Sequence, residues 1–110
     1  MVFKFRAVNR DIFEAIREGK KKIETRARTE KFVTIRSGDM VTCICGEDSF
    51  EKRIKAVKSF KTIAEMLKEY AVREINPRVQ STRELEEMYD SFPGYSEKIQ
   101  QYGLIAFELE

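Results

Sequence analysis

The segment from Phe50 to Phe60 constrains the fold most strongly, because its apolar and charged residues alternate for longer than in an ordinary strand. Phe50, Ile54 and Ala56 share one face, and the adjacent apolar pair Ala56-Val57 predicts a bulge. A long charged strand can bury its few apolar residues if the sheet curls around a small core. The segment therefore predicts a curled sheet or a barrel.

Four other segments have strand patterns. Residues 36–39 and 46–49 contain the Gly, Ser and Asp that are typical of turns, and they flank an apolar run. In the last segment Ile105, Phe107 and Leu109 share one face. The predicted strands are residues 2–8, 22–28, 40–45 and 102–109.

Three helices are expected around this sheet. Asn9 is a candidate N-cap for a helix over residues 10–18, which should end at Gly19 because glycine accepts the left-handed conformation. Two later segments begin with a capping box, in which a hydroxyl residue precedes a Glu by three positions. These boxes are Thr62 with Glu65 and Ser81 with Glu84. Residues 71–80 between them are predicted to be a loop with a brief extended piece.

The predicted fold class is α+β, a small curled mixed β-barrel flanked by about three helices. A chain of 110 residues is long enough to bury one core, so residues 1–110 are expected to form a single domain. No stretch has the roughly 20 apolar residues of a membrane helix, and the first residues lack the pattern of a signal peptide. We expect a cytoplasmic protein without membrane contact.

Histidine is absent from the sequence, and this narrows the possible chemistry. Histidine is the commonest metal ligand and general base, so neither a metalloenzyme nor a His-dependent triad is expected. One residue separates Cys43 from Cys45 in an apolar run, a spacing that suits neither a strain-free disulfide nor a zinc site. We expect two reduced, buried thiols, no metal and no cofactor.

The charged residues are distributed unevenly along the chain. Residues 1–61 contain 16 Lys and Arg against 9 Asp and Glu, whereas residues 62–110 contain 5 against 10, which gives net charges of +7 and −5. This asymmetry would create a basic face suited to phosphates if the two halves separate in space. If the halves interleave, the charges form an ordinary solvated surface.

The segment from Gly19 to Arg26 resembles the motif of the activating-signal-cointegrator homology (ASCH) domain family. In that motif a helix ends at Gly and leads through Lys into a strand that carries Glu and Arg. The corresponding residues here are Gly19, Lys21, Glu24 and Arg26. Three further matches follow in the family's order, so that the resemblance extends over nearly the whole chain. They are Ser37-Gly38-Asp39, Ser59-Phe60 and Tyr102-Gly103.

The resemblance implies a fold and a function. It implies a small β-barrel of the pseudouridine-synthase and archaeosine-transglycosylase (PUA) type, which agrees with the strands and helices predicted from the residues. It also implies a basic cleft beside the barrel that accepts RNA or a modified nucleoside. A protein-interaction surface on the helices is a further alternative. Its association would depend weakly on salt, whereas phosphate binding weakens steeply as salt rises.

Lys22, Glu24 and Arg26 should project from one face of the motif strand, because side chains alternate along a strand. Ile23 and Thr25 should project from the other face. An Arg can bind a phosphate or stack on a base, and a Glu can accept from an exocyclic amine. The same charges could also form an ordinary salt bridge on a solvated face. The expected ligand-binding residues are Lys21, Lys22, Glu24, Arg26, Arg53, Lys55 and Tyr102.

Arg53 and Lys55 extend this basic face only if their strand lies beside the motif, because charges on a strand also serve to prevent aggregation. Tyr102, like Tyr95, could stack on an exposed base, a contact that contributes about 1 to 3 kcal/mol in single-strand binders. Tyr89 lies on an apolar helix face and is expected in the core.

The alternative function is that of a small hydrolase acting on N4-acetylcytidine or RNA. The resemblance implies this because some small ASCH-like proteins act on N4-acetylcytidine with a Lys, a Thr nucleophile and a supporting Glu. Lys21 matches that Lys and Glu74 lies near the place of the supporting acid, but Glu24 occupies the place of the Thr. Thr25 should face the opposite side of the strand. Lys21 and Glu24 could still activate water if burial shifted their pKa values toward neutrality.

Overall fold

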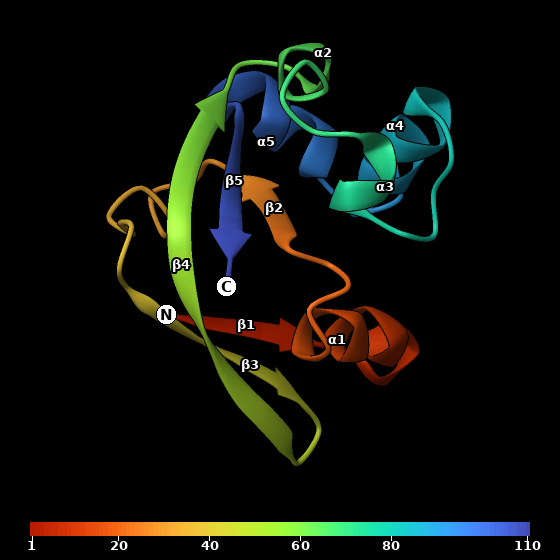
Figure 1. Ribbon diagram of the computed structural model, residues 1–110. Helices are drawn as coiled ribbons and strands as arrows, with labels where there is room; N and C mark the ends of the chain where they lie inside the picture. Colours follow the sequence, from red (N-terminus) through yellow and green to blue (C-terminus); the bar gives the residue numbers. More distant parts are fainter.

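Five strands form one sheet in the computed structural model, which describes residues 1–110 (Figure 1). The strands are β1 (Val2–Phe5), β2 (Ile23–Ala27), β3 (Met40–Cys45), β4 (Asp48–Phe60) and β5 (Leu104–Leu109). Their order in the sheet is β1-β3-β4-β5-β2, so β1 and β2 are the edge strands. β1 runs parallel to β3, and all other neighbouring strands are antiparallel.

Strand β4 has 13 residues and joins the two halves of the sheet, as Figure 1 shows. Its first half pairs with β3 and its second half with β5. The register shifts between Ile54 and Ala56, close to the predicted bulge. A bulge increases the local bend and twist of a strand. The sheet accordingly curls into a mixed half-barrel, which confirms the α+β fold class predicted from the alternating pattern.

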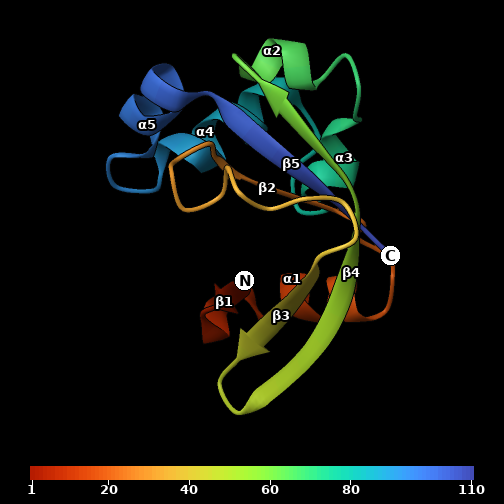
Figure 2. The same ribbon diagram turned by 90° about the vertical axis from the view of Figure 1, so that its left-hand side faces the viewer.

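The helices lie on two sides of the sheet's opening (Figure 2). α2 to α5 group on one side, whereas α1 lies with β1 on the other. Their bounds are α1 (Arg10–Arg17), α2 (Ile63–Met66), α3 (Val72–Ile75), α4 (Thr82–Asp90) and α5 (Tyr95–Tyr102), with the 3-10 helix η1 at Ala7–Asn9. Three of them, α1, α4 and α5, have eight or nine residues, so the predicted number of about three helices is correct. The set differs, because the helix expected after Thr62 is the four-residue α2, and α5 was not among the three expected. None is long and apolar enough to cross a membrane.

The first elements differ from the prediction at their ends. The first strand ends at Phe5 rather than at residue 8, because the chain turns into η1. Asn9 precedes α1, but its side chain makes no capping bond to the helix. Its Oδ1 instead accepts a hydrogen bond of 3.0 Å from Arg78. α1 then ends before Gly19, which has the predicted left-handed conformation with φ 80°.

The later elements also show two corrections. Thr62 and Ser81 cap their helices as predicted, each accepting from the backbone N–H three residues ahead at 3.1 Å. Residues 72–75 form the helical turn α3, where a loop with an extended piece was predicted. The last strand starts at Leu104 rather than at residue 102, because α5 continues to Tyr102. Gly103 makes the turn with φ 78°, and a Cβ there would lie 2.5 Å from the Phe60 carbonyl oxygen.

The apolar core has two parts, which lie on opposite faces of β5. Ile105, Phe107 and Leu109 pack into one part, together with residues of β1, α1 and β3. Leu104 and Ala106 pack into the other part, together with residues of β2 and α2 to α5. The predicted face of the last strand is therefore correct. The open side of the half-barrel, between β1 and β2, lies between the two parts.

Candidate functional site

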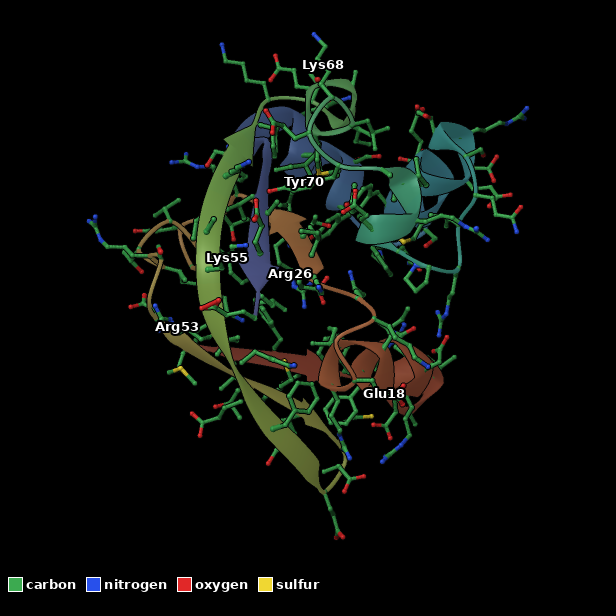
Figure 3. All side chains as sticks on the ribbon, viewed as in Figure 1. Glu18, Arg26, Arg53, Lys55, Lys68 and Tyr70 are labelled. Atoms are coloured by element: carbon green, nitrogen blue, oxygen red, sulfur yellow. The ribbon has the colours of Figure 1, made fainter.

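A cavity of about 500 Å³ occupies the opening between the end of β1 and the edge of β2. Its volume lies within the range of about 300 to 1,000 Å³ that is common for small-molecule sites. Figure 3 shows the side chain of Arg26 at this opening. The lining residues are Lys4, Phe5, Arg6, Val8, Asn9, Ile12, Lys21, Glu24, Thr25, Arg26, Ile75, Asn76, Arg78, Met88, Tyr89, Ser91, Phe92 and Tyr95.

Lys21 is the most deeply buried charged residue of the site, with 3% of its surface exposed. The backbone N–H of Lys21 bonds to the end of α1, and the side chain then enters the interior. Its Nζ donates to the carbonyl oxygens of Ile23 and Ile75, and Glu24 Oε1 lies 3.8 Å away. Burial lowers the pKa of Lys21, and the nearby Glu24 carboxylate offsets part of this effect. The ammonium group thus joins β2 to α3.

Glu24 is a buried carboxylate with 7% of its surface exposed. Its Oε1 accepts from the Thr25 backbone N–H at 3.1 Å and forms an ion pair of 3.1 Å with Arg26 Nη1. Burial alone would raise the pKa of Glu24, but the charges of Arg26 and Lys21 outweigh it and lower this pKa. The carboxylate is therefore ionised near neutral pH and needs polar partners.

Arg26 connects the two edge strands. Its Nη1 donates to the Thr25 carbonyl oxygen at 2.8 Å, and its guanidinium carbon lies 4.8 Å from the centroid of the Phe3 ring in β1. Such a cation–π contact contributes about 0.5 to 2 kcal/mol. The side chain keeps 23% of its surface exposed, so part of the guanidinium remains accessible from the cavity.

The outer edge of β2 is closed by side chains. Even-numbered residues of this strand direct their backbone groups to β5, as the bonds of Lys22 and Arg28 show. Odd-numbered residues point outward, where no strand pairs with them. Each of four outward groups has a side-chain partner, so a peptide strand cannot pair there without displacing them. The pairs are Lys21 Nζ with Ile23 O, Glu24 Oε1 with Thr25 N, Arg26 Nη1 with Thr25 O, and Tyr95 Oη with Ala27 N.

Thr25 lines the same cavity as Glu24, although the sequence predicted that they face opposite sides of the strand. The cavity extends around the edge of β2, so side chains from both faces reach it. Thr25 Oγ1 lies 2.5 Å from the hydroxyl of Tyr89, and the ring of Tyr89 stacks on Tyr95 with centroids 5.9 Å apart. Burial raises the pKa of both tyrosines, so both hydroxyls stay protonated.

Arg78 holds the two walls of the cavity together. It comes from the loop after α3 and donates to Asp11 at the start of α1, to Asn9 and to the carbonyl oxygen of Val8. The Arg78 hydrogen bond lowers the pKa of Asp11 against a smaller opposing effect of burial. No local pattern in the sequence pointed to this contact, which joins segments that are 67 residues apart.

The cavity brings together three of the predicted site residues, Lys21, Glu24 and Arg26. The other five lie outside it. Lys22 and Tyr102 are exposed elsewhere, and the Glu74 carboxylate accepts from the Ala71 N–H at 2.9 Å, where it stabilises α3. Arg53 and Lys55 lie along β4 (Figure 3), and neither lines the cavity. Arg53 pairs with Glu110 at 3.3 Å.

Several cavity residues were not predicted as part of the site. Lys4 and Arg6 are exposed cations at the end of β1, and neither has a salt bridge. Tyr89 is buried, as predicted for a core residue, but it also lines the cavity, and its hydroxyl bonds to that of Thr25. Tyr95 was considered only for stacking, whereas it also closes the edge of β2. The only local sequence pattern that pointed to any of these residues was the placement of Lys4 and Arg6 on one face of the first predicted strand.

Comparisons with known proteins agree with this architecture. The family model of the ASCH domain matches residues 7–110. A crystal structure of the hypothetical protein PH0355 is similar at 28% identity and a TM-score of 0.80, covering 100% of this chain and 98% of that one. A solution NMR structure of protein PF0455 from Pyrococcus furiosus is 31% identical with a TM-score of 0.76, covering 100% and 96%. None of the curated proteins matches the sequence.

Proposed function

Because this chain belongs to the ASCH domain family, we propose that it binds RNA or a modified nucleoside in the cavity between β1 and β2. The family is generally associated with RNA binding. The observation that carries the proposal for this cavity is the set of Lys21, Glu24 and Arg26 gathered beside two stacked tyrosines. These groups provide charge, hydrogen bonding and an aromatic surface within one nucleoside-sized space.

The charges of the lining favour an anionic ligand. Five cationic side chains and one carboxylate line the cavity. Lys21, Arg26 and Arg78 are held by protein partners, whereas Lys4 and Arg6 are exposed and have no salt bridge. Free cations at the entrance can contact phosphates while a base enters between the walls. This division supports a nucleotide or a flipped base of an RNA strand as the ligand.

The proposal is tested by titrating short single-stranded RNA into two double variants at several salt concentrations. Lys4→Ala with Arg6→Ala removes the cations at the cavity entrance, and affinity should fall about tenfold or more. Its salt dependence, the slope of log K against log salt, should decrease by about 1 to 1.5. Arg53→Ala with Lys55→Ala is the matched control, because it removes the same charge outside the cavity. That control should change affinity less than twofold.

Equal losses in the two double variants would contradict the cavity as the binding site. Absence of salt-sensitive RNA binding by the wild type would contradict the function itself. Wild type and both double variants are measured at the same salt concentrations, so that a wrong binding site and a lack of RNA binding give different results.

A hydrolase is the second candidate, because Lys21, Glu24 and the Thr25 hydroxyl line one cavity. The test is release of acetate from N4-acetylcytidine. An enzyme that uses this hydroxyl would lose acetate release in Thr25→Val by a much larger factor than any loss of nucleoside affinity. No acetate release by the wild type would leave binding as the function.

A further inference from the structure

Glu24 uses only one of its two carboxylate oxygens in the protein. Oε1 meets the Thr25 N–H, Arg26 Nη1 and Lys21 Nζ, whereas Oε2 accepts no hydrogen bond. The residue is more than nine-tenths buried, with 7% of its surface exposed. An ionised oxygen in such surroundings is a strong acceptor, and leaving it without a donor is costly.

The free oxygen opens into the cavity. Every side-chain nitrogen or oxygen that is sealed from solvent has a hydrogen-bond partner, so the unpartnered Oε2 is not sealed. Glu24 lines the cavity. Oε2 therefore meets whatever enters between β1 and β2, and a ligand must donate to it or leave a buried charge unsatisfied.

A metal ion or a cationic ligand does not suit this oxygen. Lys21 and Arg26 both approach the same carboxylate from its other side, at 3.8 Å and 3.1 Å. Their positive charges repel a second cation but attract the electron-rich face of a neutral base or the phosphate of a nucleotide. A neutral N–H group satisfies Oε2 without adding charge.

We propose that Glu24 Oε2 selects ligands by accepting a hydrogen bond from an N–H on the inward edge of a nucleobase, either an amino or an imino group. This inference rests on the proposed function and adds its recognition element. The hydroxyls of Thr25 and Tyr89 extend the same wall and form one hydrogen bond with each other. One hydroxyl proton is used in this bond, so the proton of the other hydroxyl can be donated to an acceptor on a base. The wall thus presents an acceptor beside a donor.

Glu24→Gln reverses the polarity of this element with little change of shape. The three groups near Oε1 are all N–H donors, so the glutamine oxygen must occupy the Oε1 place. Its amide nitrogen then stands at the Oε2 place and donates instead of accepting. Glu108→Gln is the matched control. Glu108 lies in β5, accepts a hydrogen bond from the hydroxyl of Tyr70 and does not line the cavity.

The experiment measures binding of the four common ribonucleoside 5′-monophosphates, together with purine riboside and pyrimidin-2-one riboside 5′-monophosphates, whose bases carry no N–H. The best natural nucleotide should bind wild type about 10 to 100 times more tightly than the N–H-free analogue of its ring class. Glu24→Gln should remove or reverse this ratio, and Glu108→Gln should preserve it.

Three results would overturn the inference: analogues that bind wild type within twofold of the natural nucleotides, a folded Glu24→Gln that keeps the full ratio, or no mononucleotide binding at all. If Glu24→Gln fails to fold, the wild-type ratio alone decides the matter. RNA binding that still depends on Lys4 and Arg6, without base discrimination, would leave the proposed function intact and defeat only this inference. Loss of RNA binding as well would defeat both.

Discussion

The chain carries two groups of basic residues in or just before strands, and their surroundings differ completely. Lys21 and Arg26 at β2 are buried or half-buried, share one carboxylate and bond to backbone carbonyls. Arg53 and Lys55 on β4 are exposed, and Arg53 pairs only with Glu110 near the C-terminal end. Desolvated charges held in place act strongly on a ligand, whereas exposed charges are screened by water and salt.

The positions of these residues in the sheet explain this difference. The first half of β4 pairs with β3 and the second half with β5, and the side chains of Arg53 and Lys55 lie on the surface. β2 is an edge strand, and its outward backbone groups need side-chain partners. Lys21, Glu24 and Arg26 thus serve the fold and the cavity together. Equal charge in the sequence does not imply an equal role.

The largest expected effect that separates the two groups is on stability. Lys21→Met should lower the free energy of unfolding by about 3 to 5 kcal/mol, because it leaves two carbonyls without their donor and the buried Glu24 carboxylate with Arg26 as its remaining cation. Lys55→Met on the exposed strand should change it by less than about 0.5 kcal/mol. Denaturation in urea measures both. Similar values for the two variants would show that the burial of Lys21 has no energetic importance.

A smaller effect should follow when the charge is kept and only the shape of the cation changes. Arg26→Lys retains the charge but loses the planar group that contacts Glu24, the Thr25 carbonyl and the Phe3 ring. We expect a loss of about 1 to 2 kcal/mol. Arg53→Lys should have almost no effect, because its side chain is 63% exposed. Thermal unfolding of the pair checks this, and an unaffected Arg26→Lys would mean that charge alone matters at β2.

The smallest expected effect concerns pH. The folded protein lowers the pKa of Glu24 below its ordinary value of 4.5, so the ionised carboxylate contributes stability above that pH. This contribution disappears as pH falls through the lowered pKa. The difference in unfolding free energy between wild type and Glu24→Gln should therefore be constant near neutral pH and shrink in acid. A difference that grows in acid would contradict the ionised state assigned to Glu24.

Much of the fold could be predicted because it depends on local patterns. The alternation over residues 50–60 and the flanking turn residues predicted β3 and β4 closely, and two capping boxes located α2 and α4. α3 was missed because four residues are too few to show a helical period. The first strand was predicted too long because Arg6 and Val8 continue its alternation, whereas the chain has already turned into η1.

The site could be predicted only where one short segment contains it. Lys21, Glu24 and Arg26 belong to a single motif, so a resemblance was enough to select them. Arg78 and Arg6 reach the cavity from remote segments, and their roles depend on the strand order. Lys55 and Tyr102 were selected for their residue type, although the sheet and α5 hold them outside the cavity.

The proposed RNA ligand enters the opening at β2 and does not lie along β4. The most direct measurement is a titration of isotope-labelled protein with short single-stranded RNA, followed by the backbone amide signals of both strands. Large shifts are expected for Thr25 and Ala27, whose N–H groups bond to Glu24 and Tyr95, and small shifts for residues 53–58 of β4. Large shifts along β4 with an unchanged β2 would contradict it.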